Sequence, residues 1–197
     1  MLFRKLPLIA ALLMTVAMTD EGAAAGSPQV LMKTSMGEVV IELYPDKAPK
    51  TVDNFLKYVK SGFYTDTVFH RVINGFMIQG GGYPKSMYQG EMGRKENFPP
   101  IELESKNGLK NDTGWLAMAR TSVPNSATSQ FFINVTDNDM LNHPKPDGHG
   151  YAVFGKVIKG MEVVNAIKGV KTTRMGPMAD VPAEPVVIES ITVVGGK

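Results

Sequence analysis

The sequence predicts one mainly β domain, an antiparallel barrel or sandwich that carries two helices. Short runs rich in Val, Ile, Phe and Tyr recur along the chain, with Gly, Pro, Asn or Asp between them. Two segments have helical periodicity instead, and no repeat, linker or low-complexity tract divides the chain. The 197 residues are enough for one domain of ordinary size or at most two small ones.

Residues 1–25 are expected to be an export signal and not part of this fold. Arg4 and Lys5 precede the apolar segment 6–18, whose 13 residues are fewer than the roughly 20 that cross a bilayer. Small residues around Ala25 fit a cleavage site, with an uncleaved membrane anchor as the alternative interpretation. We therefore expect residues 26–197 to form a single exported domain with no membrane attachment, periplasmic, or secreted if the source has no periplasm.

A hairpin and a helix are the first predicted elements of the mature chain. Apolar runs at residues 30–34 and 39–44 flank a glycine-containing turn, a pattern typical of a β-hairpin. Within residues 48–62, apolar side chains recur at i, i+3, i+4 and i+7, with Pro49 near the start and Gly62 just past the last of them. This spacing predicts one amphipathic helix that packs on a sheet.

The remaining strands and a second helix follow, separated by loops. Further runs with β propensity lie at residues 68–73, 76–79, 115–119, 130–135, 151–158 and 186–194. A second short helix fits residues 160–169, which glycines bracket. The polar, Gly- and Asn-rich segments 80–114 and 136–150 are predicted to be long surface loops, and long loops in a compact domain are often functional.

The composition and the short motifs exclude several classes of function. The net charge is +2 and no block of like charges occurs, so a nucleic-acid interface is not expected. The chain has no cysteine for disulfides or thiol catalysis, and its three histidines lack the spacing of zinc ligands. The glycine run 80–82 lacks the Lys-Ser/Thr of a phosphate loop, and no G-x-S-x-G is present. We therefore expect neither a metal nor another cofactor.

An arginine and a glutamine interrupt two otherwise apolar strands. In V-F-H-R-V-I, strand alternation places Phe69, Arg71 and Ile73 on one face. In F-M-I-Q, Met77 and Gln79 share a face, and S-A-T-S-Q-F-F-I-N again sets a glutamine beside paired phenylalanines. The residues alone leave two interpretations open: a core in which Arg71 is ion-paired with a carboxylate, or a functional surface.

Three ordered motifs carry a resemblance to a known family. F-H-R-V-I-x-G-F-M-I-Q-G-G, then S-Q-F-F-I, then Y-A-V-F-G-K-V-I-K-G-M-E-V-V resemble the cyclophilin family of peptidyl-prolyl cis–trans isomerases. The similarity covers residues 29–194, nearly the whole mature chain, and is greatest to the periplasmic bacterial members. It implies a closed eight-stranded antiparallel β-barrel capped by two α-helices, and an enzyme that needs no cofactor or metal.

The resemblance implies that four residues are catalytic. Arg71 would be the catalytic arginine, and Phe76 and Phe132 would form the hydrophobic pocket for the substrate proline. Gln79 would hydrogen-bond the substrate backbone and help to hold Arg71.

The resemblance also implies a set of substrate-binding residues around these four: Met77 in the proline pocket, Leu141 at its rim, Gln130 in a neighbouring groove, Ala119 beside the residue before proline, and Arg120, Met140 and Tyr151. The last three depart from the family pattern. Arg120 stands where many members have an asparagine that pairs with the peptide backbone. Met140 and Tyr151 stand where the best-known eukaryotic members have tryptophan and histidine.

The expected activity is isomerisation of X-Pro bonds in unfolded or folding exported proteins, by a monomer. Rotation about this amide is opposed by about 20 kcal/mol of C–N double-bond character. A guanidinium beside the proline nitrogen stabilises the twisted amide, in which that nitrogen regains its lone pair. The main alternative is a binding module that docks proline-containing segments, and a metal- or serine-dependent hydrolase is a distant third.

Overall fold

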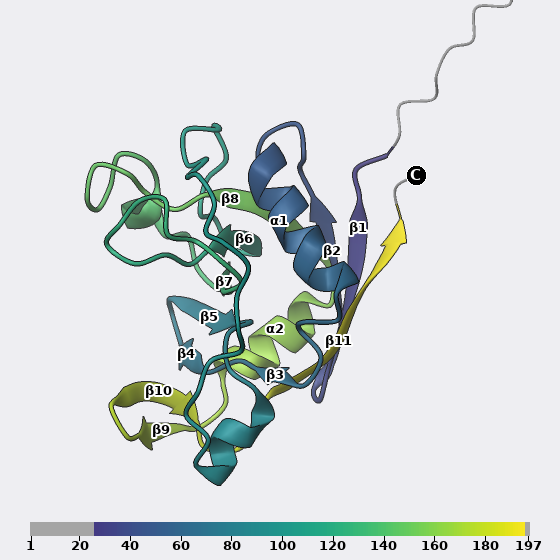
Figure 1. Cartoon of the computed structure of the whole chain (residues 1–197), viewed down its shortest axis with the longest axis vertical. Coiled ribbons are helices and arrows are strands. Elements are labelled where there is room, and N and C mark those ends of the chain that lie inside the picture. Colours follow the sequence, from purple (N-terminus) through teal and green to yellow (C-terminus); the bar gives the residue numbers. More distant parts are fainter. Residues whose placement is uncertain (1–25, 196–197) are drawn as a thin grey trace, which may run out of the picture.

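The computed structural model describes residues 26–195, which form a curled antiparallel sheet with two α-helices (Figure 1). The strands are β1 (Gln29–Thr34), β2 (Gly37–Leu43), β3 (Thr67–Val68), β4 (Arg71–Ile73), β5 (Met77–Gly80), β6 (Trp115–Met118), β7 (Phe131–Asn134), β8 (Val153–Lys159), β9 (Thr172–Met175), β10 (Met178–Pro182) and β11 (Val187–Gly195). The helices are α1 (Pro49–Lys60) and α2 (Met161–Lys168), with 3₁₀ turns η1 (Lys85–Gln89) and η2 (Asp139–Leu141) in the long loops. The predicted export signal, residues 1–25, lies outside the described part of the chain, within which no helix is long and apolar enough to cross a membrane.

Nine strands form one antiparallel sheet in the order β3-β11-β1-β2-β8-β6-β7-β5-β4. Its two end strands, β3 and β4, are separated in the chain only by Phe69 and His70. The sheet therefore curls until its two edges meet at this segment. The Phe69 amide donates to the Val186 carbonyl at 3.0 Å, and the His70 amide donates to the Gln79 carbonyl at 3.0 Å. The predicted mainly β fold with two helices is confirmed. This sheet has nine strands and not the expected eight, because the predicted run at 68–73 is divided into β3 and β4.

This division also changes where side chains point. Phe69 is fully buried in the main core together with Val72, whereas Arg71 is half-buried and lines a surface pocket. The expectation that Phe69 shares a face with Arg71 is therefore wrong. Strict alternation fails because Phe69 and His70 leave the strand ladder between β3 and β4.

Strand β7 separates the main core from a second apolar cluster on its other face. Phe131 packs inward, where its ring lies 5.7 Å from that of Phe55 on α1. Its neighbour Phe132 points to the opposite face and joins Met77 and Leu141. Because successive side chains of a strand alternate, one short run of phenylalanines contributes to both clusters.

Glu104, from the long loop before β6, caps helix α1. Ala48 at the N-cap offers no side-chain acceptor, and Pro49 follows it. The Glu104 carboxylate accepts instead from the Lys50 amide at 3.1 Å, the Thr51 amide at 2.8 Å and the Thr51 hydroxyl at 2.7 Å. The exposed N–H groups and positive dipole end of the helix favour such an anion, so this contact fixes the long loop to α1.

A small hairpin is the one pair of described strands that the sequence pattern did not predict. β9 and β10 form a separate two-stranded sheet that pairs Met175 with Met178 around Gly176 and Pro177. Gly176 has φ of 57°, the left-handed region that glycine adopts at little cost. The Gly-Pro pair was the turn signal that could have indicated this hairpin.

Replacement of Glu104 by alanine is expected to lower the free energy of unfolding by about 1 to 2 kcal/mol, the usual cost of a lost helix cap. Urea denaturation at pH 7 measures the change. Glu91→Ala, which removes an exposed carboxylate from the same loop, is the matched control and should leave stability close to wild type. Equal loss in the two variants would contradict the capping role.

Candidate active site

Strand register places three of the predicted catalytic residues in one row. Arg71 on β4 is paired with Gln79 on β5, and Gln79 is paired in turn with Phe132 on β7. Directly paired residues of adjacent antiparallel strands point to the same face of the sheet. The row therefore carries a charge, an amide and an aromatic ring side by side on the outer face.

A cavity of about 230 Å³ lies over this row and is called the Arg71 pocket here. Its lining comprises nine of the eleven predicted site residues: Arg71, Phe76, Met77, Gln79, Ala119, Arg120, Phe132, Leu141 and Tyr151. Gln130 lies in the adjoining hollow, as expected for a neighbouring groove. Met140 is 55% exposed and does not line the pocket, because η2 turns the adjacent Leu141 inward instead.

Arg71 carries an uncompensated charge. It is half-buried, yet no carboxylate in residues 26–195 forms an ion pair with it. A guanidinium that is partly removed from water and left unpaired is costly unless a ligand completes its interactions. The interpretation of Arg71 as a core residue ion-paired with a carboxylate is not supported within these residues.

Gln79 is oriented by another glutamine and not by Arg71. Its side-chain amide donates to the Gln130 side-chain oxygen at 2.9 Å. No side-chain hydrogen bond joins Arg71 to Gln79 among the described contacts, so the expectation that Gln79 helps to hold Arg71 stays a prediction. The Gln79 side-chain oxygen consequently remains available as an acceptor for Arg71 or a ligand.

A buried asparagine network supports the pocket from below. Asn138 donates to the Phe76 carbonyl at 2.9 Å and to the Asn134 side chain at 2.7 Å. The Asn134 side chain donates to the Trp115 carbonyl at 3.0 Å, and the backbone amide of Asn111 donates to the side-chain oxygen of Asn142 at 2.7 Å. These contacts join β7 to the turn that carries Phe76 and to η2. Sequence periodicity did not identify them, because most of them connect residues distant in the chain.

Arg120 is committed to the protein. Its side chain is 1% exposed and forms a two-pronged ion pair with Asp147, at 2.8 and 2.7 Å. It also donates to the Gly150 carbonyl at 2.9 Å, and its guanidinium lies 4.6 Å from the centre of the Tyr151 ring. The hydrogen bond from Arg120 lowers the pKa of the Asp147 carboxyl below its usual range. Arg120 therefore fixes the loop that carries Tyr151 and is not free to pair with a peptide backbone.

His70 is buried beside the row of Arg71, Gln79 and Phe132. It is 4% exposed, its ring lies 4.8 Å from that of Tyr83, and its Nδ1 has no hydrogen-bond partner in the described structure. Burial lowers the pKa of His70 to about 4, with a smaller contribution from the nearby Arg94 and Arg71 charges. The imidazole is therefore neutral at pH 7.

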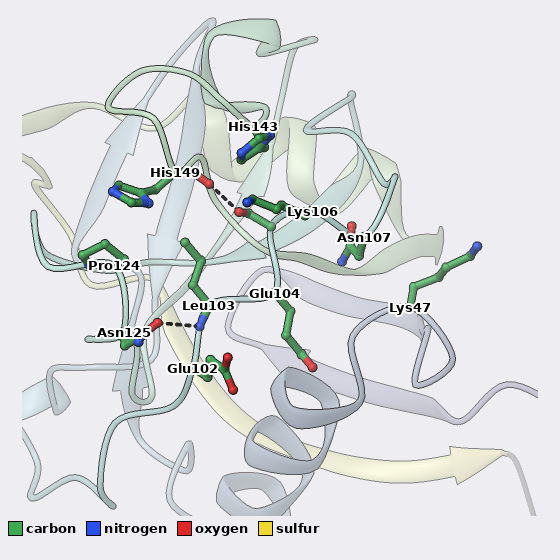
Figure 2. Close-up of a pocket in the computed structure, with 11 residues that line it drawn as sticks. Lys47, Glu102, Leu103, Glu104, Lys106, Asn107, Pro124, Asn125, His143 and His149 are labelled. Atoms are coloured by element: carbon green, nitrogen blue, oxygen red, sulfur yellow. Dashed lines mark hydrogen bonds between the residues drawn. The ribbon is translucent and has the colours of Figure 1, made fainter.

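A larger cavity, about 570 Å³, lies elsewhere and contains none of the predicted site residues (Figure 2). Its wall includes Glu102, Glu104, Lys106, His143 and His149. Glu104 there is engaged with α1, and Glu102 is paired with Lys50. No group of three or more His, Cys, Asp or Glu side chains within residues 26–195 could hold a metal ion.

Comparison with known proteins identifies the family. Residues 29–193 match the family described as cyclophilin type peptidyl-prolyl cis-trans isomerase/CLD. Peptidyl-prolyl cis-trans isomerase B of Escherichia coli is 56% identical over 83% of this chain and 98% of its own. Peptidyl-prolyl cis-trans isomerase A of Dickeya dadantii is 49% identical over 97% of both chains. A crystal structure of a Cryptosporidium parvum cyclophilin-type isomerase, obtained in the presence of the dipeptide Ala-Pro, has a TM-score of 0.70 at 31% identity and covers 85% of this chain and 99% of that one.

The curled antiparallel sheet with two helices is thus a cyclophilin fold. The chain belongs to the cyclophilin-type peptidyl-prolyl cis–trans isomerases. Its activity is the isomerisation of X-Pro peptide bonds, and its substrates are proline-containing peptides.

The burial of His70 predicts a loss of stability in acid. Below pH 6.5 the unfolded chain binds a proton at His70 that the folded chain does not bind until about pH 4. The free energy of unfolding should therefore fall as the pH is lowered through this window, with about 2 to 3 kcal/mol of the loss due to His70. Urea denaturation of wild type and His70→Gln at pH 7.5 and 4.5 measures this part, because carboxylate contributions are common to both proteins.

His149→Gln, at an exposed histidine, is the control and should keep the pH dependence of wild type. An identical fall in stability for His70→Gln and wild type would show that His70 is not responsible.

Proposed function

We propose that this isomerase twists exposed X-Pro bonds of exported polypeptides without covalent chemistry, with Arg71 as the catalytic residue. The observation that carries the proposal is the unpaired charge of Arg71 at the wall of an apolar pocket. The resting protein leaves that charge incompletely satisfied, and the twisted amide supplies the missing acceptor. An interaction that forms in the transition state and not in the planar substrate accelerates the reaction.

The pocket walls suit a proline ring. Phe76, Met77, Phe132 and Leu141 present apolar surface, and Phe132 meets the Tyr151 ring edge-on at 5.7 Å. Burial of the ring in this pocket holds one side of the peptide bond and lowers the local dielectric. An interaction between Arg71 and the proline nitrogen is stronger in such a setting than in water.

Gln79 and its neighbours act on the other side of the bond. The pairing with Gln130 holds Gln79 beside Arg71, where its free oxygen can accept from the guanidinium or from a substrate amide. Ala119 offers little side-chain bulk next to this pair, which leaves room for the residue that precedes proline. Rotation then needs only one end of the bond to turn while the other end stays bound.

Action on exported proteins follows from the N-terminal pattern. Basic residues, a short apolar segment and small residues before residue 26 are typical of an export signal. The alignment with the Dickeya dadantii isomerase covers 97% of this chain and so extends into this segment. In the periplasm, slow X-Pro isomerisation limits the folding of some newly exported chains, and the enzyme accelerates it as a monomer.

Arg71→Ala is expected to lower kcat/KM for cis-to-trans isomerisation of a short X-Pro peptide by about 10²- to 10³-fold, the usual cost of one preorganised donor. Arg71→Lys retains the charge but not the planar set of donors and should fall in between. Arg174→Ala, at an exposed arginine on β9, is the control and should match wild type. Acceleration that survives in Arg71→Ala would keep the activity but refute this mechanism.

Expression of the full chain in a Gram-negative host tests the export. We expect the protein in the fraction released by osmotic shock, with a new N-terminus after Ala25. Deletion of residues 6–18 is expected to retain the protein in the cytoplasm. Recovery of uncleaved full-length chain from the cytoplasmic fraction would refute the proposed localisation.

A further inference from the structure

Arg94 lies where two further hollows meet beside the Arg71 pocket. The first, the side hollow, has a volume of about 150 Å³ and shares Ala119 and Arg120 with the Arg71 pocket. The second, the hairpin hollow, has a volume of about 320 Å³ and shares Arg71 with it. Arg94, Gln79 and Gln130 line both hollows, so a chain that occupies the Arg71 pocket passes close to Arg94.

The side chain of Arg94 is held in place although the residue is exposed. Its Nε donates to the Tyr83 hydroxyl at 2.9 Å, and its guanidinium lies 5.4 Å from the centre of the Tyr83 ring. Tyr83 is itself only 8% exposed and packs on the buried ring of His70. The Arg94 charge is therefore preorganised by a fixed aromatic support, which reduces the entropy lost when a ligand binds.

The charges around Arg94 leave both hollows positive. No carboxylate of the described residues forms an ion pair with Arg94, whereas Arg120 in the side hollow is neutralised by Asp147. In the hairpin hollow, Arg71 and Arg94 face the single carboxylate of Asp180. His70 adds no charge at pH 7, and its pKa is lowered partly by these two arginines.

We propose that Arg94 determines specificity, favouring polypeptides with an Asp or Glu close to the isomerised proline. The proposal rests on the proposed function, because the hollows matter to a substrate only if its proline occupies the Arg71 pocket. Neighbouring residues of an extended chain are about 3.3 Å apart along the strand, so side chains flanking the proline reach the adjoining hollows. An exposed charge pair of this kind corresponds to about a two- to fivefold gain in kcat/KM, reduced by high salt.

The test compares two pairs of X-Pro peptides that differ only by Glu against Gln, placed two residues before or two residues after the proline. We measure kcat/KM for wild type, Arg94→Gln, Arg94→Lys and Arg174→Gln at low and high ionic strength. For at least one pair, wild type is expected to prefer Glu by about two- to fivefold at low salt, and the preference should shrink at high salt. Arg94→Gln should lose the preference and Arg94→Lys should retain part of it.

Arg174→Gln changes the net charge equally but lies outside both hollows, so it should keep the full preference. Thermal unfolding of each variant verifies that the fold is intact. Equal rates for Glu and Gln peptides in wild type, or a preference that persists in Arg94→Gln, would overturn the specificity role while leaving the isomerase mechanism in place. Failure of the proposed function has a different signature, namely a rate with either peptide that is unaffected by Arg71→Ala.

Discussion

The alternation of side chains along β7 is the constraint on which both the core and the site depend. β7 lies between β5 and β6 in the sheet, so each of its residues has neighbours on both sides. Phe131 faces the aromatic core under α1, and Phe132 faces the pocket, so a shift of one residue in register would exchange them. Because both residues are phenylalanines, that pair alone would tolerate the exchange. The same shift would, however, turn Ile133 out of the core and bring Asn134 into it, which breaks the asparagine network below the pocket. Stability and function therefore select the same register.

The loops around the sheet position the pocket through polar contacts and not through apolar burial. Asn138 ties the turn carrying Phe76 to β7, and Arg120 with Asp147 ties the loop before Tyr151 to the end of β6. Hydrogen bonds and ion pairs are directional, so they hold a rim in one place where apolar contacts alone would allow sliding. The apolar surface can then remain open to a ligand.

The grouping of Arg71, Gln79 and Phe132 came from the family resemblance, because their row joins three separate strands. Local sequence pattern predicted the hairpin and both helices, because each rests on spacing within one segment. It misplaced Phe69, since a kink of two residues breaks the alternation that the inference assumed. It also missed the cap from Glu104 and the asparagine network. Most of those contacts join residues far apart in the chain, such as Thr51 with Glu104 and Asn111 with Asn142, and nothing in periodicity specifies which distant side chains meet. The family resemblance added an expected role for each pocket residue, which residue type and spacing alone left open.

The pairing of β11 has a consequence for the newly made chain. β11 lies between β1 and β3, so it completes pairings with two strands that are synthesised long before it. Until it arrives, both of those strands have an unfilled edge, and the curled sheet cannot form as a unit. Contacts so distant in sequence also form slowly. A chain of this topology therefore acquires its complete sheet only after β11 has been synthesised.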